Sequence, residues 1–176
     1  GWNMQLEEWQ NAKIEYDIVL RHEPNNIAAL YYRAYCNDRL GRYNFARLDY
    51  QTVLTLVPGN FEARLGLALL NEKDQHLTEA YDGINSLIEQ YPDSAVAYAA
   101  RGGMEKERGM LDLAVYDYGE AMRLDSTCQD YVVNHADLLI SLGRKSEAYD
   151  DLRRLQTMGV KSGQLQDFFA RLRRKK

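Results

Sequence analysis

The stretch that decides the fold is residues 25–58, NNIAALYYRAYCNDRLGRYNFARLDYQTVLTLVP. It begins directly after Pro24 and ends at Pro58, and a further proline, Pro92, follows at the same interval. The next position in this series holds Ser126. A period of about 34 residues is typical of a helix–turn–helix unit that stacks on copies of itself.

Four further series of residues share this spacing. Alanine recurs at Ala12, Ala46, Ala80, Ala114 and Ala148. A second set of small residues comprises Ala34, Ala68, Gly102 and Ala136. Glycine occupies Gly41, Gly109 and Gly143, with Gln75 in the remaining slot. Large apolar residues recur at Tyr16, Tyr50, Ile84, Tyr118 and Leu152. Five series with one period indicate a repeat along nearly the whole chain.

The residues between these positions predict where helices begin and end. Proline cannot continue a helix, and the Asn or Ser that follows it can accept a free N–H group of the next helix. Glycine between two helices allows the left-handed conformation that ends the first one. We therefore expect ten helices, at about 3–22, 27–40, 43–56, 61–73, 77–90, 95–108, 111–124, 129–142, 145–158 and 163–174. The last is expected to cap the stack with Leu165, Phe168, Phe169 and Leu172 on one face.

These positions resemble the tetratricopeptide repeat (TPR) family. Its pattern has a small residue in the first helix of each repeat (helix A), a glycine turn, an aromatic residue or Leu and then Ala in the second helix (helix B), and a closing Pro. The matching residues are Trp9, Ala12, Tyr16, Val19 and Pro24; Ala34, Gly41, Tyr43, Ala46, Tyr50 and Pro58; Ala68, Leu77, Ala80 and Pro92; Gly102, Gly109, Leu111, Ala114 and Tyr118; and Ala136, Gly143 and Ala148.

The resemblance implies an all-α fold, a right-handed superhelical solenoid of antiparallel helix pairs. The expected divisions of this one domain are a partial repeat at 1–26, repeats at 27–60, 61–94, 95–128 and 129–160, and a capping helix with a basic tail at 161–176. The chain departs from the family pattern in helix A. The family's Trp is replaced by Leu30, Arg64, Tyr98 and Val132, and its Tyr by Asn37, Asn71, Glu105 and Leu139.

Charges at equivalent positions of helices A and B predict structural ion pairs. In three repeats a cation in helix A is followed, always at the same spacing, by an acid in helix B, and the repeat that lacks the cation also lacks the acid. The pairs are Arg33 with Asp49, Arg101 with Asp117, and His135 with Asp151. Such pairs can fix the register of two helices. The alternative is that Arg33 and Arg101 hold an anionic ligand.

In the family, helix A of each repeat lines a concave groove, so the resemblance implies a peptide-binding site there. The residues at these positions are Tyr31, Tyr35, Asp38, Leu65, Leu69, Glu72, Ala99, Gly103, Lys106 and Asp137. The Lys, Arg and Asn residues with which one TPR group grips a terminal carboxylate are absent from the inner positions. The strip is instead apolar and rich in tyrosine, with more acids than bases at its rims, which suits a partner peptide with apolar anchors and modest positive charge. Gly103 would either leave room for a partner or relieve crowding in the helix.

Composition and motifs favour a protein-binding function over a catalytic one. The net charge is −4, from 22 basic and 26 acidic residues, which argues against a dedicated nucleic-acid binder. No apolar run is long enough for a membrane span. The three histidines lie at unrelated repeat positions, and Cys36 and Cys128 have no metal-ligand spacing. We therefore expect no catalytic residues, no metal and no cofactor.

Both ends of the sequence leave alternatives open. The start at Gly1 suggests trimming, so a removed signal peptide would place the protein in the periplasm or outside the cell, and otherwise it would be cytoplasmic. Trp2, Leu6 and Trp9 could form an exposed edge for homo-oligomerisation. The basic tail, residues 171–176, could contact nucleic acid or a membrane surface.

Overall fold

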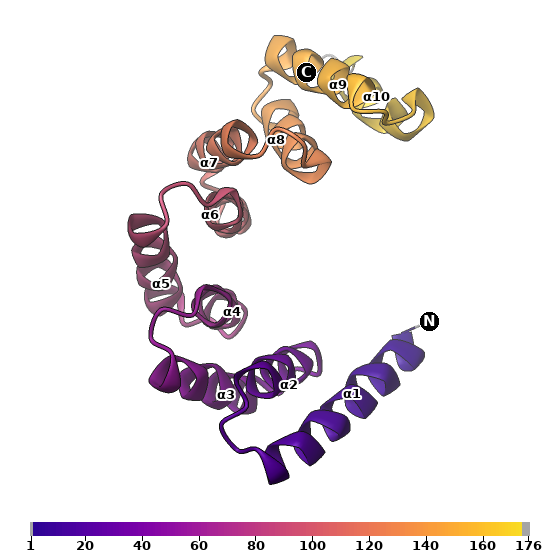
Figure 1. The fold of residues 1–176 in the computed structure, drawn as a ribbon. Coiled ribbons are helices and arrows are strands. Elements are labelled where there is room, and N and C mark those ends of the chain that lie inside the picture. The colour runs from indigo at the N-terminus through magenta and orange to yellow at the C-terminus, as the bar shows by residue number, and fades with distance from the viewer. Residues whose placement is uncertain (1, 174–176) are drawn as a thin grey trace. The chain divides into compact units, whose positions relative to one another are not determined.

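A computed structural model describes residues 2–173 of the chain and the side chains of residues 4–173 (Figure 1). Ten α-helices and one 3-10 helix occupy these residues, and no strand occurs among them. The α-helices are α1 (Trp2–His22), α2 (Ile27–Arg39), α3 (Tyr43–Leu56), α4 (Phe61–Lys73), α5 (Leu77–Gln90), α6 (Ala95–Glu107), α7 (Leu111–Leu124), α8 (Gln129–Ser141), α9 (Lys145–Thr157) and α10 (Gln166–Arg173). The all-α class is confirmed, and the expected helices before residue 160 lie within one residue of their expected bounds.

Caps and turns place the helix ends where the sequence predicts them. The side chains of Asn26, Asn60 and Ser94 each accept a hydrogen bond from the backbone N–H three residues ahead, at the starts of α2, α4 and α6. The turns after α2, α4, α6 and α8 each contain one residue with positive φ, and Gln75 adopts φ 61° in the slot where the other turns have glycine. The slot therefore imposes a left-handed backbone even on a residue with a Cβ atom.

The C-terminal helix begins later than the sequence predicts. Residues Ser162–Leu165 form a 3-10 turn, and α10 starts at Gln166. The backbone N–H of Lys161 donates to Oε1 of Gln164 at 3.1 Å, which ties the first turn together before the α-helix begins. A 3-10 turn is a common way to begin an α-helix. Leu165 and Leu172 are buried on the face that the sequence predicts.

The chain divides into two compact units, Gly1–Leu87 and Ile88–Lys176, which we describe separately. In unit 1, the buried core is built from α1–α4 and includes Leu20, Leu30, Tyr50, Val53 and Leu70. Small residues at the helix contacts let the backbones approach, because Ala34, Ala46 and Ala80 are fully buried and a larger side chain would overpack them.

Unit 2 has a core of its own. It contains Tyr118 and Met122 from α7, Leu139 from α8, and Leu152 and Leu155 from α9. The capping helix α10 adds Leu172 to this cluster, and Phe168 and Phe169 pack against it. The cap therefore covers apolar surface that the last helix pair would otherwise expose.

Candidate functional site

A cavity of about 140 Å³ lies in unit 1 between helices α2 and α4. Its lining comprises Tyr31, Tyr35, Asp38, Arg39, Tyr50, Glu62, Leu65, Gly66, Leu69 and Lys73. Five of the residues expected in the groove thus come together here, Tyr31, Tyr35, Asp38, Leu65 and Leu69. Glu72 also lies on α4 and is half-buried, but it does not line this cavity.

The side chain of Tyr50, which extends from α3, also lines the cavity. A Cβ atom at Gly66 would lie 2.7 Å from Cζ of Tyr50, so this glycine is required for the ring to fit. The ring of Tyr31 lies 5.9 Å from that of Tyr50. Burial, together with the nearby Glu62, raises the pKa of the Tyr31 hydroxyl. This phenol therefore stays neutral at physiological pH and offers an O–H donor.

One rim of the cavity carries an ion pair within the chain. Nζ of Lys73 donates to Oδ2 of Asp38 at 2.6 Å, which neutralises an acid that the sequence assigned to the groove. The other oxygen of Asp38, Oδ1, is buried and accepts no hydrogen bond from the described residues. A buried acceptor without a donor is costly, so a donor supplied by a ligand would be favourable here.

Trp9 is partly buried, whereas the sequence suggests that it lies on an exposed edge. Its ring meets that of Tyr35 edge-on at 5.5 Å, and the guanidinium of Arg39 lies 5.7 Å from its centre. Leu6 is also partly buried, while the side chain of Trp2 lies outside the described residues. Helix α1 thus contributes an aromatic wall beside Tyr35. The match of α1 to a helix B places Trp9 in the repeat pattern, but it does not indicate a contact with Tyr35 of the next helix A.

The expected groove residues of unit 2 lie on α6 and α8. Nζ of Lys106 donates to Oδ2 of Asp137 at 2.9 Å, and Nη1 of Arg171 donates to Oδ1 at 2.7 Å. Burial opposes ionisation of Asp137, but these two hydrogen bonds prevail and lower the pKa of its carboxyl. Arg171 is thus bonded within the protein, whereas residues 174–176 of the basic tail lie outside the described part.

Gly103 has space for a side chain. A Cβ atom there would approach no atom closer than the hydroxyl of Tyr118, at 3.6 Å, which is an ordinary contact. At its neighbour Gly102, a Cβ would lie 3.0 Å from the Tyr118 ring and 3.3 Å from Cβ of Asp117. Gly102 is therefore needed for packing. Crowding does not explain Gly103, while Ala99 nearby packs against the core of unit 2.

The structure brings together each cation and acid that the sequence paired. Arg33 donates to both oxygens of Asp49 at 2.8 and 2.6 Å, and Arg101 donates to both oxygens of Asp117 at 2.6 and 2.8 Å. In the third pair, Nδ1 of His135 lies 2.6 Å from Oδ2 of Asp151. These carboxylates are buried, so the pairs lie between the helices rather than in the groove.

Two features of this network were missed. Arg33 also donates to Asp17 of α1 at 3.0 Å, and Asp17 accepts from Lys13 at 2.6 Å, so the first pair extends into the partial repeat. In unit 2, burial and the charge of Asp117 raise the pKa of Glu105 to about 7. Glu105 occupies a family tyrosine position, and nothing in the local sequence signals that an acid there would be buried beside Asp117.

The described residues hold no cluster of three or more His, Cys, Asp or Glu side chains placed to bind a metal ion. Within the same residues, no helix has both the length and the apolar character needed to cross a membrane. Cys36 and Cys128 are free thiols.

Comparisons with known proteins agree with the helical-repeat geometry. The sequence model of the tetratricopeptide repeat family matches residues 62–94. A tetratricopeptide repeat protein from Parabacteroides merdae has a similar structure, with a TM-score of 0.78 and 22% identity over 97% of this chain and 67% of that one. A thermophilic TPR protein from Thermus thermophilus has a TM-score of 0.74 and 19% identity over 97% of this chain and 94% of that one.

A curated relative matches at the sequence level only in part. Asparagine–tRNA ligase from Buchnera aphidicola is 29% identical over 133 residues, which cover 69% of this chain. The chain spans only 28% of the length of that ligase.

Proposed function

Because this chain is a tetratricopeptide repeat protein, a family whose general role is protein–protein interaction, we propose that it is a non-catalytic scaffold that binds a peptide segment of a partner protein. The groove in unit 1 that α2 and α4 line is the proposed site. The α6 and α8 face of unit 2 is the corresponding surface, with Gly103 leaving room for a partner backbone or side chain.

The observation that carries this proposal is the cavity between Tyr35 and Leu69. Tyrosine supplies a large contact area at a low cost in side-chain entropy, and Leu65 and Leu69 supply apolar surface for an anchor residue. The unpaired Oδ1 of Asp38 is an acceptor for an N–H group of the peptide. An extended or helical segment with apolar anchors and a basic or amide donor fits these groups best.

The experiment that tests this function is affinity capture from a lysate of the source organism, followed by mass spectrometry. The wild-type protein is compared with the variant Tyr35→Asp plus Leu69→Asp, which places two charges in the cavity. A matched control, Ile18→Asp plus Leu56→Asp, makes the same kind of change at two exposed apolar positions outside it. Circular dichroism checks that all three proteins are folded.

We expect a partner that the wild type and the control both retain and that the groove variant loses. The segment of that partner is then mapped with overlapping peptides by isothermal titration calorimetry. Equal capture by the groove variant and the wild type would rule out this groove as the binding site.

A further inference from the structure

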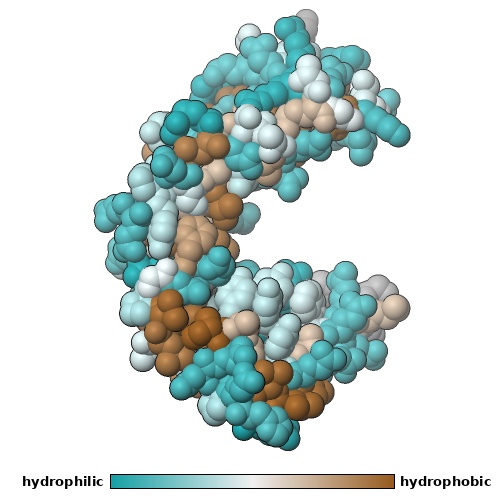
Figure 2. Space-filling model, viewed as in Figure 1, coloured by the Kyte–Doolittle hydropathy of each residue, from teal (hydrophilic) through white to brown (hydrophobic). Residues whose placement is uncertain are grey.

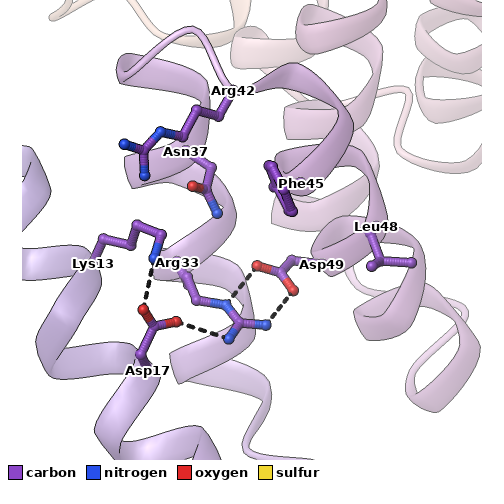
Figure 3. A pocket seen from close by; sticks show the side chains of 8 residues that line it. All are labelled: Lys13, Asp17, Arg33, Asn37, Arg42, Phe45, Leu48 and Asp49. Atoms are coloured by element: carbon purple, nitrogen blue, oxygen red, sulfur yellow. Dashed lines mark hydrogen bonds and ion pairs between the residues drawn. The ribbon is translucent and has the colours of Figure 1, made fainter.

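A second and larger pocket lies in unit 1, and it shares no residue with the groove. Its volume is about 340 Å³, and α1, α2 and α3 form its walls (Figure 3). The lining comprises Lys13, Asp17, Arg33, Asn37, Arg42, Phe45, Leu48 and Asp49. The pocket lies in the size range of ligand and anchor sites.

Four of the charges in this pocket neutralise one another. Figure 3 shows Asp17 between Lys13 and Arg33, and Arg33 in turn bound to Asp49. The two cations and two acids thus form one continuous chain of ion pairs. This network leaves little demand for an anionic ligand at Arg33, because its guanidinium already donates to both acids.

Arg42 and Asn37 lie outside that network. The side chain of Arg42 is exposed and makes no ion pair with any described residue. Asn37 is only 2% exposed, and its Oδ1 accepts no hydrogen bond from the described residues. One repeat further on, Oδ1 of Asn71 accepts from Nε of Arg47 at 3.3 Å. The same side chain is thus satisfied within the chain in one repeat and left without a donor in this pocket.

Two large apolar side chains form the open wall of the pocket. Phe45 is 64% exposed and Leu48 is 61% exposed, both on α3. They follow Arg42 at successive helical intervals, which places all three on one side of the start of α3. Figure 2 shows apolar surface in separate patches among hydrophilic side chains over the helices of unit 1.

Helix α7 of unit 2 carries a second group of exposed apolar side chains, which lies beside an acid instead of a base. Leu113 is 54% exposed and Tyr116 is 63% exposed. Asp112 beside them is exposed and forms no ion pair with a described residue, although its charge, after that of Glu147, helps to raise the pKa of the Arg144 guanidinium. Asp112 and Tyr116 are one helical turn apart and therefore lie on one side of the helix. This face offers a carboxylate, apolar surface and a phenolic O–H donor.

The equivalent positions on two other helices B lack this combination. The residues that correspond to Leu113 and Tyr116 are Glu79 and Asp82 in α5, and Glu147 and Asp150 in α9. Acids at these positions suit the hydrated outer side of a helix. Phe45 and Leu48 of α3 occupy the same two positions of the repeat. The apolar pairs of α3 and α7 thus differ from the acidic pairs of α5 and α9.

We propose that the pocket between α1, α2 and α3 binds the α7 face of a second copy of this chain. In this contact, Asp112 pairs with Arg42, and Leu113 and Tyr116 cover Phe45 and Leu48. The charge and the apolar side chains of one surface are thereby matched by those of the other.

This contact joins two different surfaces, so it leaves a free pocket on one copy and a free face on the other. Such a heterologous contact continues to add copies unless the geometry closes a ring. The mean mass of the protein should therefore rise with concentration and pass that of a dimer. An isologous contact through either surface alone would stop at two copies.

Sedimentation velocity over a concentration series tests this, with variants that each disable one surface. Phe45→Asp disables the pocket, and Tyr116→Asp disables the face; both side chains are exposed, and circular dichroism checks the fold. Each variant alone should remain monomeric. An equimolar mixture should form a one-to-one dimer that does not grow further, because each partner retains one competent surface.

Charge reversal provides an independent test of the pairing. Arg42→Glu should abolish association, and the double variant Arg42→Glu with Asp112→Arg should restore it. Glu79→Gln, at the α5 position that corresponds to Leu113, is the control and should associate like the wild type. A wild type that stays monomeric, a single variant that still associates, or a mixture that stays monomeric would each overturn the proposal.

Discussion

Glu105 should make the stability of unit 2 depend on pH. The side chain is 5% exposed and lies beside the bonded pair of Arg101 and Asp117. Burial, and then the charge of Asp117, raise its pKa from the ordinary 4.5 to about 7. The difference corresponds to about 3 kcal/mol in the free energy of unfolding, since one pKa unit is worth ~1.4 kcal/mol.

The sign follows from proton binding. Below pH 4.5 both states hold the proton of Glu105, and the group contributes nothing to pH dependence. Between pH 4.5 and 7 the folded state keeps the proton that the unfolded state has released, so stability falls as pH rises. Above pH 7 both states are ionised, and the folded protein bears the full cost of a buried carboxylate.

The variant Glu105→Gln removes this titration and keeps the shape of the side chain. Urea unfolding of the variant and the wild type should be followed by circular dichroism at half-unit steps from pH 4.5 to pH 8. We expect the free-energy difference in favour of the variant to grow by up to about 3 kcal/mol over this range. A difference that stays constant with pH would refute the reasoning, because it would show that Glu105 titrates alike in both states.

The remaining predictions concern stability and can be measured by the same unfolding assay. Gly103→Ala should stabilise the protein by about 0.5–1 kcal/mol, because alanine has the higher helix propensity and its methyl group has space. Gly102→Ala should destabilise the protein by about 1–3 kcal/mol, because its methyl group meets the ring of Tyr118. Equal effects of the two substitutions would contradict the packing described. Asn60→Ala should cost about 1 kcal/mol through loss of the cap on α4, whereas Asn60→Ser should recover most of it. Gln75→Gly should not destabilise and should gain up to about 1 kcal/mol by relieving the positive φ, and a clear loss would show that the turn depends on the side chain.

The helices could be predicted because their signals are local and repeat with the period. A Pro, a capping Asn and a turn glycine act on the residues beside them, so their spacing carries directly into the structure. Even Gln75, which breaks the glycine series, adopts the left-handed backbone of its slot. The start of α10 was less accurate, because no repeat covers the C-terminal end and a side-chain contact of Gln164 decides the first turn.

Contacts within a repeat could also be anticipated, whereas those between repeats could not. The pairs from helix A to helix B all have the same separation in sequence, as for Arg33 and Asp49. The ion pairs across repeats do not, because Lys73 follows Asp38 by 35 positions whereas Asp137 follows Lys106 by 31. Long side chains reach different turns of the next helix, so the period of the repeat does not determine their partners.

Asp137 carries a consequence for how the C-terminal end of unit 2 opens. Its two oxygens hold Lys106 of α6 and Arg171 of α10, so one carboxylate joins three helices that are not consecutive in the chain. A stack of repeats ordinarily frays from its ends, since each repeat contacts only its neighbours. Here the fraying of α10 removes one of the two cations from a carboxylate that also fastens α6. Loss of the last helix therefore weakens the contact between α8 and α6 as well. The end of unit 2 then opens as a cooperative block larger than the capping helix alone.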